Sequence, residues 1–294
     1  MLNFYFYYLR FFSILISFLC FLNILYSYYF DLYLNVNSYF YTLLISIIPL
    51  LSFFFKKKDT KIDIYSKIIT VILGYITLPV LISLPYLFSI YNIPFLDCYF
   101  EAVSGFTSTG FTIFNNIKHL DESLILWRSS SQWIGGLYFL VFLILIFSNK
   151  QINFKMIDLS FNLEKKINFS SNLISVTNRI FLIYVSLTLL VFLAFLLSGI
   201  RLFDSLNLAM TVMSSGGFIP TNSLDEIIRN NFQSVILCFA FLISILNFYF
   251  FYNIVLKRDN LKQHREEIYL FILIIIFSII FYLFNDLNLS FVFL

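Results

Sequence analysis

Apolar runs long enough to cross a lipid bilayer recur along almost the whole of this sequence. A helix needs about 20 apolar residues to cross a hydrocarbon core of about 30 Å. Hydrophobic residues make up 60% of the 294 residues and charged residues 12%, against roughly 45–50% and about 25% in soluble domains. The sequence therefore predicts an all-α polytopic membrane protein. We expect about seven transmembrane helices, near 9–30, 37–55, 67–91, 123–148, 173–198, 232–256 and 268–285.

The basic residues orient these helices. Two further apolar stretches, near 95–106 and 203–214, are too short to cross. If they enter the membrane without crossing it and the N-terminus is cytoplasmic, the outer side holds only Lys118, Arg128, Arg201 and Arg229, and every other Lys and Arg lies inside. Cytoplasmic loops carry the excess of basic residues in membrane proteins. We therefore expect a multi-pass protein with a cytoplasmic N-terminus.

The two short stretches are copies of one another. Asp97, Ala102, Ser108, Gly110 and Phe111 recur as Asp204, Ala209, Ser215, Gly217 and Phe218, each at the same offset (204 − 97 = 107). Each copy follows one full span and precedes another, so the unit is helix, half-length helix, Gly-containing turn, helix. This is the plan of a re-entrant pore loop. The alternative is a pair of ordinary interhelical loops, and repetition at one constant offset argues against it.

A half-length helix followed by irregular backbone exists at membrane depth only where protein or a water-filled cavity satisfies its polar groups. Four of the eight glycines, Gly105, Gly110, Gly216 and Gly217, fall in these loops, and glycine permits close approach to a ligand. Carbonyls and hydroxyls without charge replace the hydration shell of a monovalent cation. The predicted ion-binding residues are Thr107, Ser108, Thr109, Gly110, Phe111, Ser214, Ser215, Gly216, Gly217 and Phe218.

Other classes of function are poorly supported. Cys20, Cys98 and Cys238 have no paired spacing, and His119 and His264 are the two histidines, so we expect no disulfide framework and no metal site. The scattered basic residues do not imply nucleic acid. A membrane-embedded enzyme would need intramembrane catalytic groups, and apart from Glu101 and Arg128 none is evident. We expect no catalytic residues and no cofactor.

Three segments resemble the Trk/Ktr/HKT superfamily of potassium transporters, and most closely its TrkH-like branch. The first is Phe100-Glu101-Ala102-Val103-Ser104-Gly105-Phe106-Thr107-Ser108-Thr109-Gly110-Phe111, which is similar to the first selectivity filter of that family. The second is Leu126-Trp127-Arg128-Ser129-Ser130-Ser131-Gln132-Trp133-Ile134-Gly135-Gly136, which resembles the start of the following helix. The third runs from Phe203-Asp204 to Ser214-Ser215-Gly216-Gly217-Phe218 and resembles the second filter.

The residues alone support only a small, weakly hydrated monovalent cation as the transported ion. The family resemblance implies that this cation is potassium. It implies a pore-forming subunit of a Trk-type uptake system in the bacterial inner (plasma) membrane, surrounded by lipid, with the key filter glycines at Gly110 and Gly217. It also implies a homodimer or a complementary membrane chain. A cytosolic nucleotide-binding regulatory subunit would contact the inner loops at 149–172 and 257–267.

The resemblance further divides the chain into an N-terminal two-helix hairpin (1–58), a first helix–pore loop–helix repeat (59–150), a second repeat (151–262) and the first helix of a truncated third repeat (263–294). The family has four repeats around one pore, so we expect the chain to be incomplete without the missing repeats. A non-conducting truncated remnant is the alternative.

The roles of several side chains stay open at this point. Asp97, Glu101 and Asp204 either gather cations at the outer mouth or cap the pore helices. Arg128 either pairs with a pore-loop carboxylate or extends to the membrane interface. Gly135 and Gly136 are expected to permit close packing on a pore helix.

Overall fold

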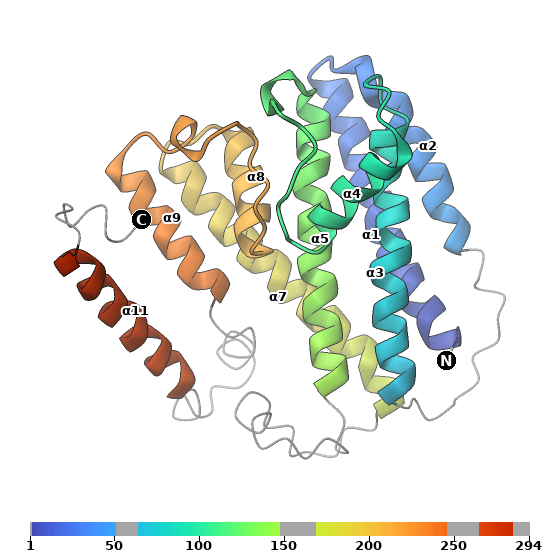
Figure 1. Cartoon of the computed structure of the whole chain (residues 1–294). Helices are drawn as coiled ribbons and strands as arrows, with labels where there is room; N and C mark the ends of the chain where they lie inside the picture. Colours follow the sequence, from blue (N-terminus) through green and yellow to red (C-terminus); the bar gives the residue numbers. More distant parts are fainter. Residues whose placement is uncertain (1, 51–63, 148–168, 246–264, 285–294) are drawn as a thin grey trace.

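A computed structural model describes residues 2–50, 64–147, 169–245 and 265–284, and within these ranges the chain is helical and contains no strand (Figure 1). The helices are α1 (Leu2–Tyr29), α2 (Val36–Ile47), α3 (Ile64–Leu87), α4 (Phe95–Phe106), α5 (Glu122–Phe147), α7 (Phe169–Leu197), α8 (Leu202–Met213), α9 (Asn231–Ile245) and α11 (Arg265–Phe284). Single 3₁₀ turns lie at η1 (Tyr33–Asn35), η3 (Ile117–His119) and η4 (Leu224–Glu226). The expected all-α class is confirmed.

The expected spans overlap these helices. Those near 9–30, 67–91 and 173–198 correspond to α1, α3 and α7, the described helices that are long and apolar enough to cross a membrane. Those near 37–55, 123–148, 232–256 and 268–285 overlap α2, α5, α9 and α11, although residues 51–55, 148, 246–256 and 285 lie outside the described ranges. Polar residues from Arg128 to Gln132 interrupt the apolar run of α5. The number of crossings therefore stays a prediction.

Two half-length helices, α4 and α8, lie where the sequence repeat predicts them. Each has 12 residues, and their bounds differ by the offset of the repeat (202 − 95 = 107). At about 1.5 Å per residue each is about 18 Å long, too short for a hydrocarbon core of about 30 Å. The chain enters the bundle along α4 and returns to the same end before α5, and it repeats this path at α8 and α9 (Figure 1).

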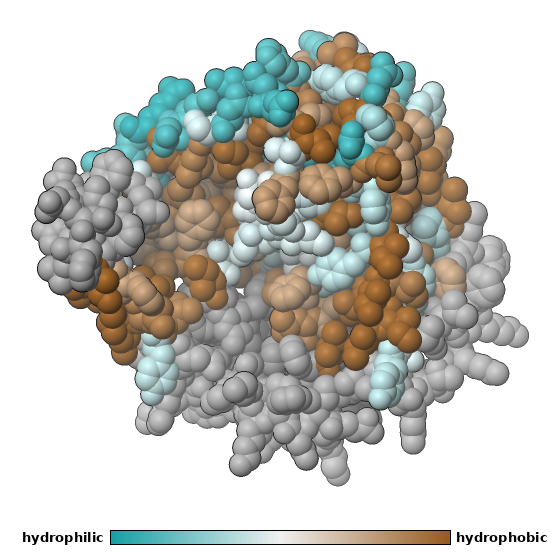
Figure 2. Space-filling view, viewed as in Figure 1, coloured by the Kyte–Doolittle hydropathy of each residue, from teal (hydrophilic) through white to brown (hydrophobic). Residues whose placement is uncertain are grey.

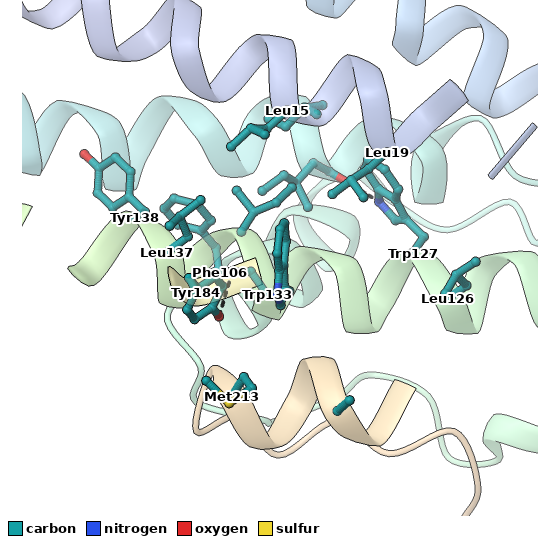
Figure 3. Close-up of a cluster of buried hydrophobic side chains, with 14 of the residues drawn as sticks. Leu15, Leu19, Phe106, Leu126, Trp127, Trp133, Leu137, Tyr138, Tyr184 and Met213 are labelled. Carbon is teal, nitrogen blue, oxygen red and sulfur yellow. Dashed lines mark hydrogen bonds between the residues drawn. The ribbon is translucent and has the colours of Figure 1, made fainter. Parts of the chain in front are cut away.

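Helix α5 lies at the centre of the bundle and contacts α1, α3, α4, α7 and α8. Its side chains join neighbours on both sides, because Trp127 Nε1 donates to the carbonyl of Ile82 on α3 and Trp133 Nε1 donates to Thr188 Oγ1 on α7, both at 3.0 Å. Figure 3 shows Trp127 and Trp133 among buried hydrophobic side chains from several helices. The core is therefore organised around one helix.

Two consecutive glycines let both half-length helices reach α5. A Cβ on Gly135 would overlap the carbonyl of Phe106, the last residue of α4. A Cβ on Gly136 would lie 2.9 Å from the Cα of Ser214, the residue that follows α8. Small residues permit this close backbone approach between membrane helices. The expected role of Gly135 and Gly136 in close helix packing is confirmed, and it applies to both half-length helices.

The N-terminal hairpin is tied to the bundle through Asn35. Its Nδ2 donates to Asp121 Oδ2 at 3.3 Å, and its Oδ1 accepts from the backbone N–H of Ile90 at 3.2 Å. Ser123 Oγ donates to the same Asp121 oxygen at 2.7 Å. These buried hydrogen bonds fix the turn between α1 and α2 against the end of α3 and the start of α5.

The molecular surface separates polar and apolar regions along the helix direction. Figure 2 shows hydrophilic residues gathered along the end that carries the loops before α5 and α9, and hydrophobic residues below them. Large apolar side chains on the outer helices are exposed, including Leu25 on α1, Ile76 on α3 and Leu193 on α7. A broad exposed apolar surface of this kind is suited to lipid.

We predict that Gly135→Ala destabilises the protein by about 1–3 kcal/mol, because the added methyl group meets backbone that cannot rotate away. Thermal unfolding of the purified protein in detergent measures this change. Phe139→Leu is the control, since Phe139 lies on the same helix and is exposed. An unchanged unfolding temperature for Gly135→Ala would show that α4 does not pack on α5 as described.

Candidate functional site

The two loops that follow α4 and α8 have the same backbone hydrogen bonds. Each forms three N–H to carbonyl bonds of 2.8–3.2 Å back to its own half-length helix, at positions related by the offset of 107. The pairs are Thr107–Val103 with Ser214–Met210, Ser108–Gly105 with Ser215–Val212, and Thr109–Ser104 with Gly216–Thr211. The internal repeat is therefore a repeat of conformation as well as of sequence.

One hydroxyl in each repeat closes its loop. Ser104 Oγ donates to the carbonyl of Phe111 at 2.6 Å, and Thr211 Oγ1 donates to the carbonyl of Phe218 at 2.7 Å. These bonds satisfy carbonyls that lie outside any regular helix. Neither Ser104 nor Thr211 belongs to the predicted set. The signal that points to them is a hydroxyl residue at the same offset in both repeats.

The backbone of both loops enters the left-handed region. Ser108 and Ser215 have φ values of 56° and 53°, and Gly110 has a φ of 85°. A side chain is disfavoured there, so Gly110 meets a conformational need. Gly217 is not among the residues with positive φ. Its small size is needed for a different reason, which is the approach of the other loop.

The two loops meet at their glycines. A Cβ on Gly110 would lie 2.8 Å from the Cα of Gly217, and a Cβ on Gly217 would lie 3.1 Å from the Cα of Gly110. Farther along, Asn222 Nδ2 donates to Asn116 Oδ1 and Asn222 Oδ1 accepts from the Ile117 N–H, both at 2.9 Å. The structure thus brings together the two predicted halves of the site.

The predicted site residues differ in exposure. Thr107, Thr109 and Phe111 in the first loop are exposed, as are Ser215 and Gly217 in the second loop, whereas Ser214 and Phe218 are buried. The two threonine hydroxyls lie 2.7 Å apart. The site offers backbone and hydroxyl oxygens and carries no charged side chain of its own, which is the chemistry that monovalent cations accept.

Glu101 and Arg128 form a buried ion pair behind the first loop. Glu101 is 0% exposed, Arg128 is 1% exposed, and Arg128 Nε lies 2.9 Å from Glu101 Oε1. Of the two alternatives for Arg128, pairing with a pore-loop carboxylate is therefore confirmed. Placing Glu101 at an outer mouth or as a helix cap is wrong, because its carboxylate is enclosed by α5 and the first loop.

The other two acidic residues lie in the first turns of the half-length helices. Asp97 is in the first turn of α4 and exposed, and Asp204 is in the first turn of α8 and partly buried. Negative charge there is favoured by the helix dipole. Before α8, Arg201 Nη2 donates to Glu122 Oε1 at 2.6 Å, and this hydrogen bond raises the pKa of Arg201 above its ordinary value.

Gln132 is a residue of this region that the predicted set omits. Its side chain is buried, and neither its Oε1 nor its Nε2 has a hydrogen-bond partner. A Cβ on Gly216 would overlap the Gln132 amide, so that amide lies directly against the second loop. The sequence motif Gln132-Trp133 singles out this residue. Only the structure shows that its side chain points toward the second loop.

The described residues include no group of three or more His, Cys, Asp or Glu side chains placed to hold a metal ion. The three cysteines are free.

The model of the TrkH family, described as cation transport protein, matches residues 34–285. The chain belongs to the TrkH family. The segments that carry the resemblance in the sequence lie within the matched range, and the expected family is confirmed. Members of this family are transport proteins, which agrees with the absence of enzymatic function expected from the sequence.

Relatives support the same assignment. This TrkH-family chain is 29% identical over 195 residues to a cation transporter of Methanocaldococcus jannaschii, covering 65% of this chain and 41% of the relative. It is 27% identical over 233 residues to the Trk system potassium uptake protein TrkG of Escherichia coli, and the match covers 76% of this chain and 47% of TrkG. The chain thus spans less than half the length of these curated relatives.

A solved structure shows the same fold. The crystal structure of the potassium transporter TrkH from Vibrio parahaemolyticus matches with a TM-score of 0.76 at 20% identity. The match covers 97% of this TrkH-family chain and 61% of the solved chain. The arrangement of long and half-length helices described above is therefore that of the TrkH fold.

We predict that Gly216→Ala and Gln132→Ala are energetically coupled. The methyl group added at Gly216 must displace the Gln132 amide, so Gly216→Ala should cost less stability when Gln132 is already alanine. We expect a coupling free energy of about 0.5–3 kcal/mol, as for residues in direct contact. Thermal unfolding of both single variants and the double variant measures it. Additive effects would place the Gln132 side chain away from the second loop.

Proposed function

We propose that this chain supplies two of the filter strands of a potassium-transport pore. One observation carries the proposal: two loops with matching hydrogen bonds approach each other so closely that a Cβ on Gly110 would lie 2.8 Å from Gly217. Neighbouring strands of an ion filter require such an approach, because their oxygens must surround one ion. The names of the relatives, which include potassium uptake proteins, supply the identity of the ion.

The proposed filter residues are the ten predicted from the sequence, Thr107 to Phe111 and Ser214 to Phe218. Ser104 and Thr211 support them by holding the carbonyl of the last residue of each strand. The selection of potassium would then depend on the number and placement of the oxygens, since no charged side chain belongs to the set. Potassium is the substrate, and no further cofactor is proposed.

We further propose seven crossings and two re-entrant helices, with the N-terminus in the cytoplasm of a bacterial cell. Lys118, Arg201 and Arg229 belong to the loops at the polar end of Figure 2, and the N-terminus lies at the opposite end in Figure 1. Few basic residues on one side mark the outer side of an inner membrane. We also propose the division of the chain into an N-terminal hairpin (1–58), two repeats (59–150 and 151–262) and the start of a third repeat (263–294).

A ring of oxygens around an ion needs more than two strands, so the proposed pore is completed by further repeats. These come from a longer form of the protein, from a second copy in a homodimer, or from a complementary membrane chain. The exposed Thr107, Thr109 and Phe111 mark the open flank of the first strand. A cytosolic nucleotide-binding subunit is proposed by analogy, and most of its contact loops, 149–172 and 257–267, lies outside the described residues.

The first test is potassium-limited growth of a host that lacks its own potassium uptake. We expect rescue when this chain is present together with the polypeptide that supplies the remaining repeats. Rescue by this chain alone would indicate a pore made from copies of it. Failure of both, with the protein confirmed in the membrane, would contradict the proposal and favour a non-conducting remnant.

A sharper test compares two glycines that have nearly the same positive φ. Gly110 and Gly199 have φ values of 85° and 86°, but only a Cβ on Gly110 would meet another loop, since nothing lies within 4 Å of one on Gly199. We expect Gly110→Val to abolish potassium-dependent growth, and Gly217→Val to do the same. Gly199→Val should retain growth because it carries a similar backbone strain away from the filter. Growth with Gly110→Val would reject the filter assignment.

A further inference from the structure

The buried pair Glu101–Arg128 contacts the first loop directly after the proposed filter strand. Glu101 Oε1 accepts from Thr112 Oγ1 at 3.0 Å, and Glu101 Oε2 accepts from the N–H of Ile113 at 2.9 Å. Arg128 Nη2 also donates to Thr112 Oγ1, at 3.1 Å. The pair therefore fixes the two residues that follow Phe111.

The same arginine contacts the second loop. The guanidinium carbon of Arg128 lies 4.2 Å from the centroid of the Phe218 ring, which is a cation–π distance. Phe218 is the last residue of the second strand, and it is 2% exposed. One side chain on α5 thus joins the ends of both proposed filter strands.

The second repeat shows that a pore helix does not need this pair. At the offset of 107, Leu208 takes the place of Glu101, and it is buried within a helix of the same length as α4. A buried ion pair also contributes little net stability compared with well-packed apolar residues, because both charges lose their hydration. Stability therefore does not explain why a carboxylate and a guanidinium occupy this position.

We propose that Glu101 and Arg128 are positioning residues that hold the two filter strands in register and thereby set cation selectivity. The proposal rests on the proposed function, because it assumes that the strands bind the ion. The carboxylate keeps the guanidinium neutralised behind the filter, where an unpaired positive charge would repel a cation. The guanidinium in turn reaches both loops, which a lysine cannot do, because its single ammonium group lacks the planar fork.

The test uses the purified protein in its assembled form and measures its unfolding temperature against K⁺ and Na⁺ concentration. A bound ion stabilises the folded state by RT ln(1 + [ion]/Kd), so each titration yields a Kd and the two together give the ratio of K⁺ to Na⁺ affinity. The variants are Arg128→Lys, which keeps the charge, and Glu101→Gln, which keeps the shape. Lys118→Gln is the matched control, because Lys118 forms an exposed ion pair with Glu226 between the same two loops.

We expect both variants to lower the K⁺ to Na⁺ ratio by about tenfold or more, the effect of losing one hydrogen bond to a charged group. The control should keep the ratio of the unchanged protein. A variant that unfolds at a lower temperature but keeps the ratio would overturn the proposal and leave the pair a purely structural role. If the unchanged protein shows no preference for K⁺, the proposed function fails first and this inference fails with it.

Discussion

The close packing of two half-length helices on α5 is the constraint on which the site depends. Gly135 lies against the carbonyl of Phe106 and Gly136 against Ser214, so the ends of α4 and α8 are held by neighbouring residues of one helix. The two loops that follow these ends must then start close together. Their meeting at Gly110 and Gly217 is the consequence. A larger residue in α5 would separate the helices, and the loops with them.

The two loops also satisfy much of their own irregular backbone. Each returns N–H groups to its own half-length helix, and each has one carbonyl held by a hydroxyl, from Ser104 or Thr211. The symmetry ends behind the strands, where the first repeat has Glu101 paired with Arg128 and the second has Leu208. A symmetric scaffold with one asymmetric support gives the proposed filter a defined register.

The repeat made much of this predictable from sequence. The bounds of α4 coincide with the expected stretch 95–106 and those of α8 differ by one residue from 203–214, because a constant offset fixes both copies at once. The contacts of Glu101 were less predictable, since its partner lies 27 residues away and on another helix. The same holds for Gln132, whose orientation toward Gly216 depends on how α5 is rotated. Sequence periodicity predicts elements, whereas these contacts depend on packing between elements.

The most direct measurement is the position of a bound ion. Thallium(I) substitutes for K⁺ and scatters anomalously, so crystals of the assembled protein grown with it should show where the ion sits. The account predicts an anomalous peak bounded by backbone and hydroxyl oxygens of residues 107–111 and 214–218. A peak held by carboxylates elsewhere, or no peak between the two loops in a protein that transports potassium, would contradict it.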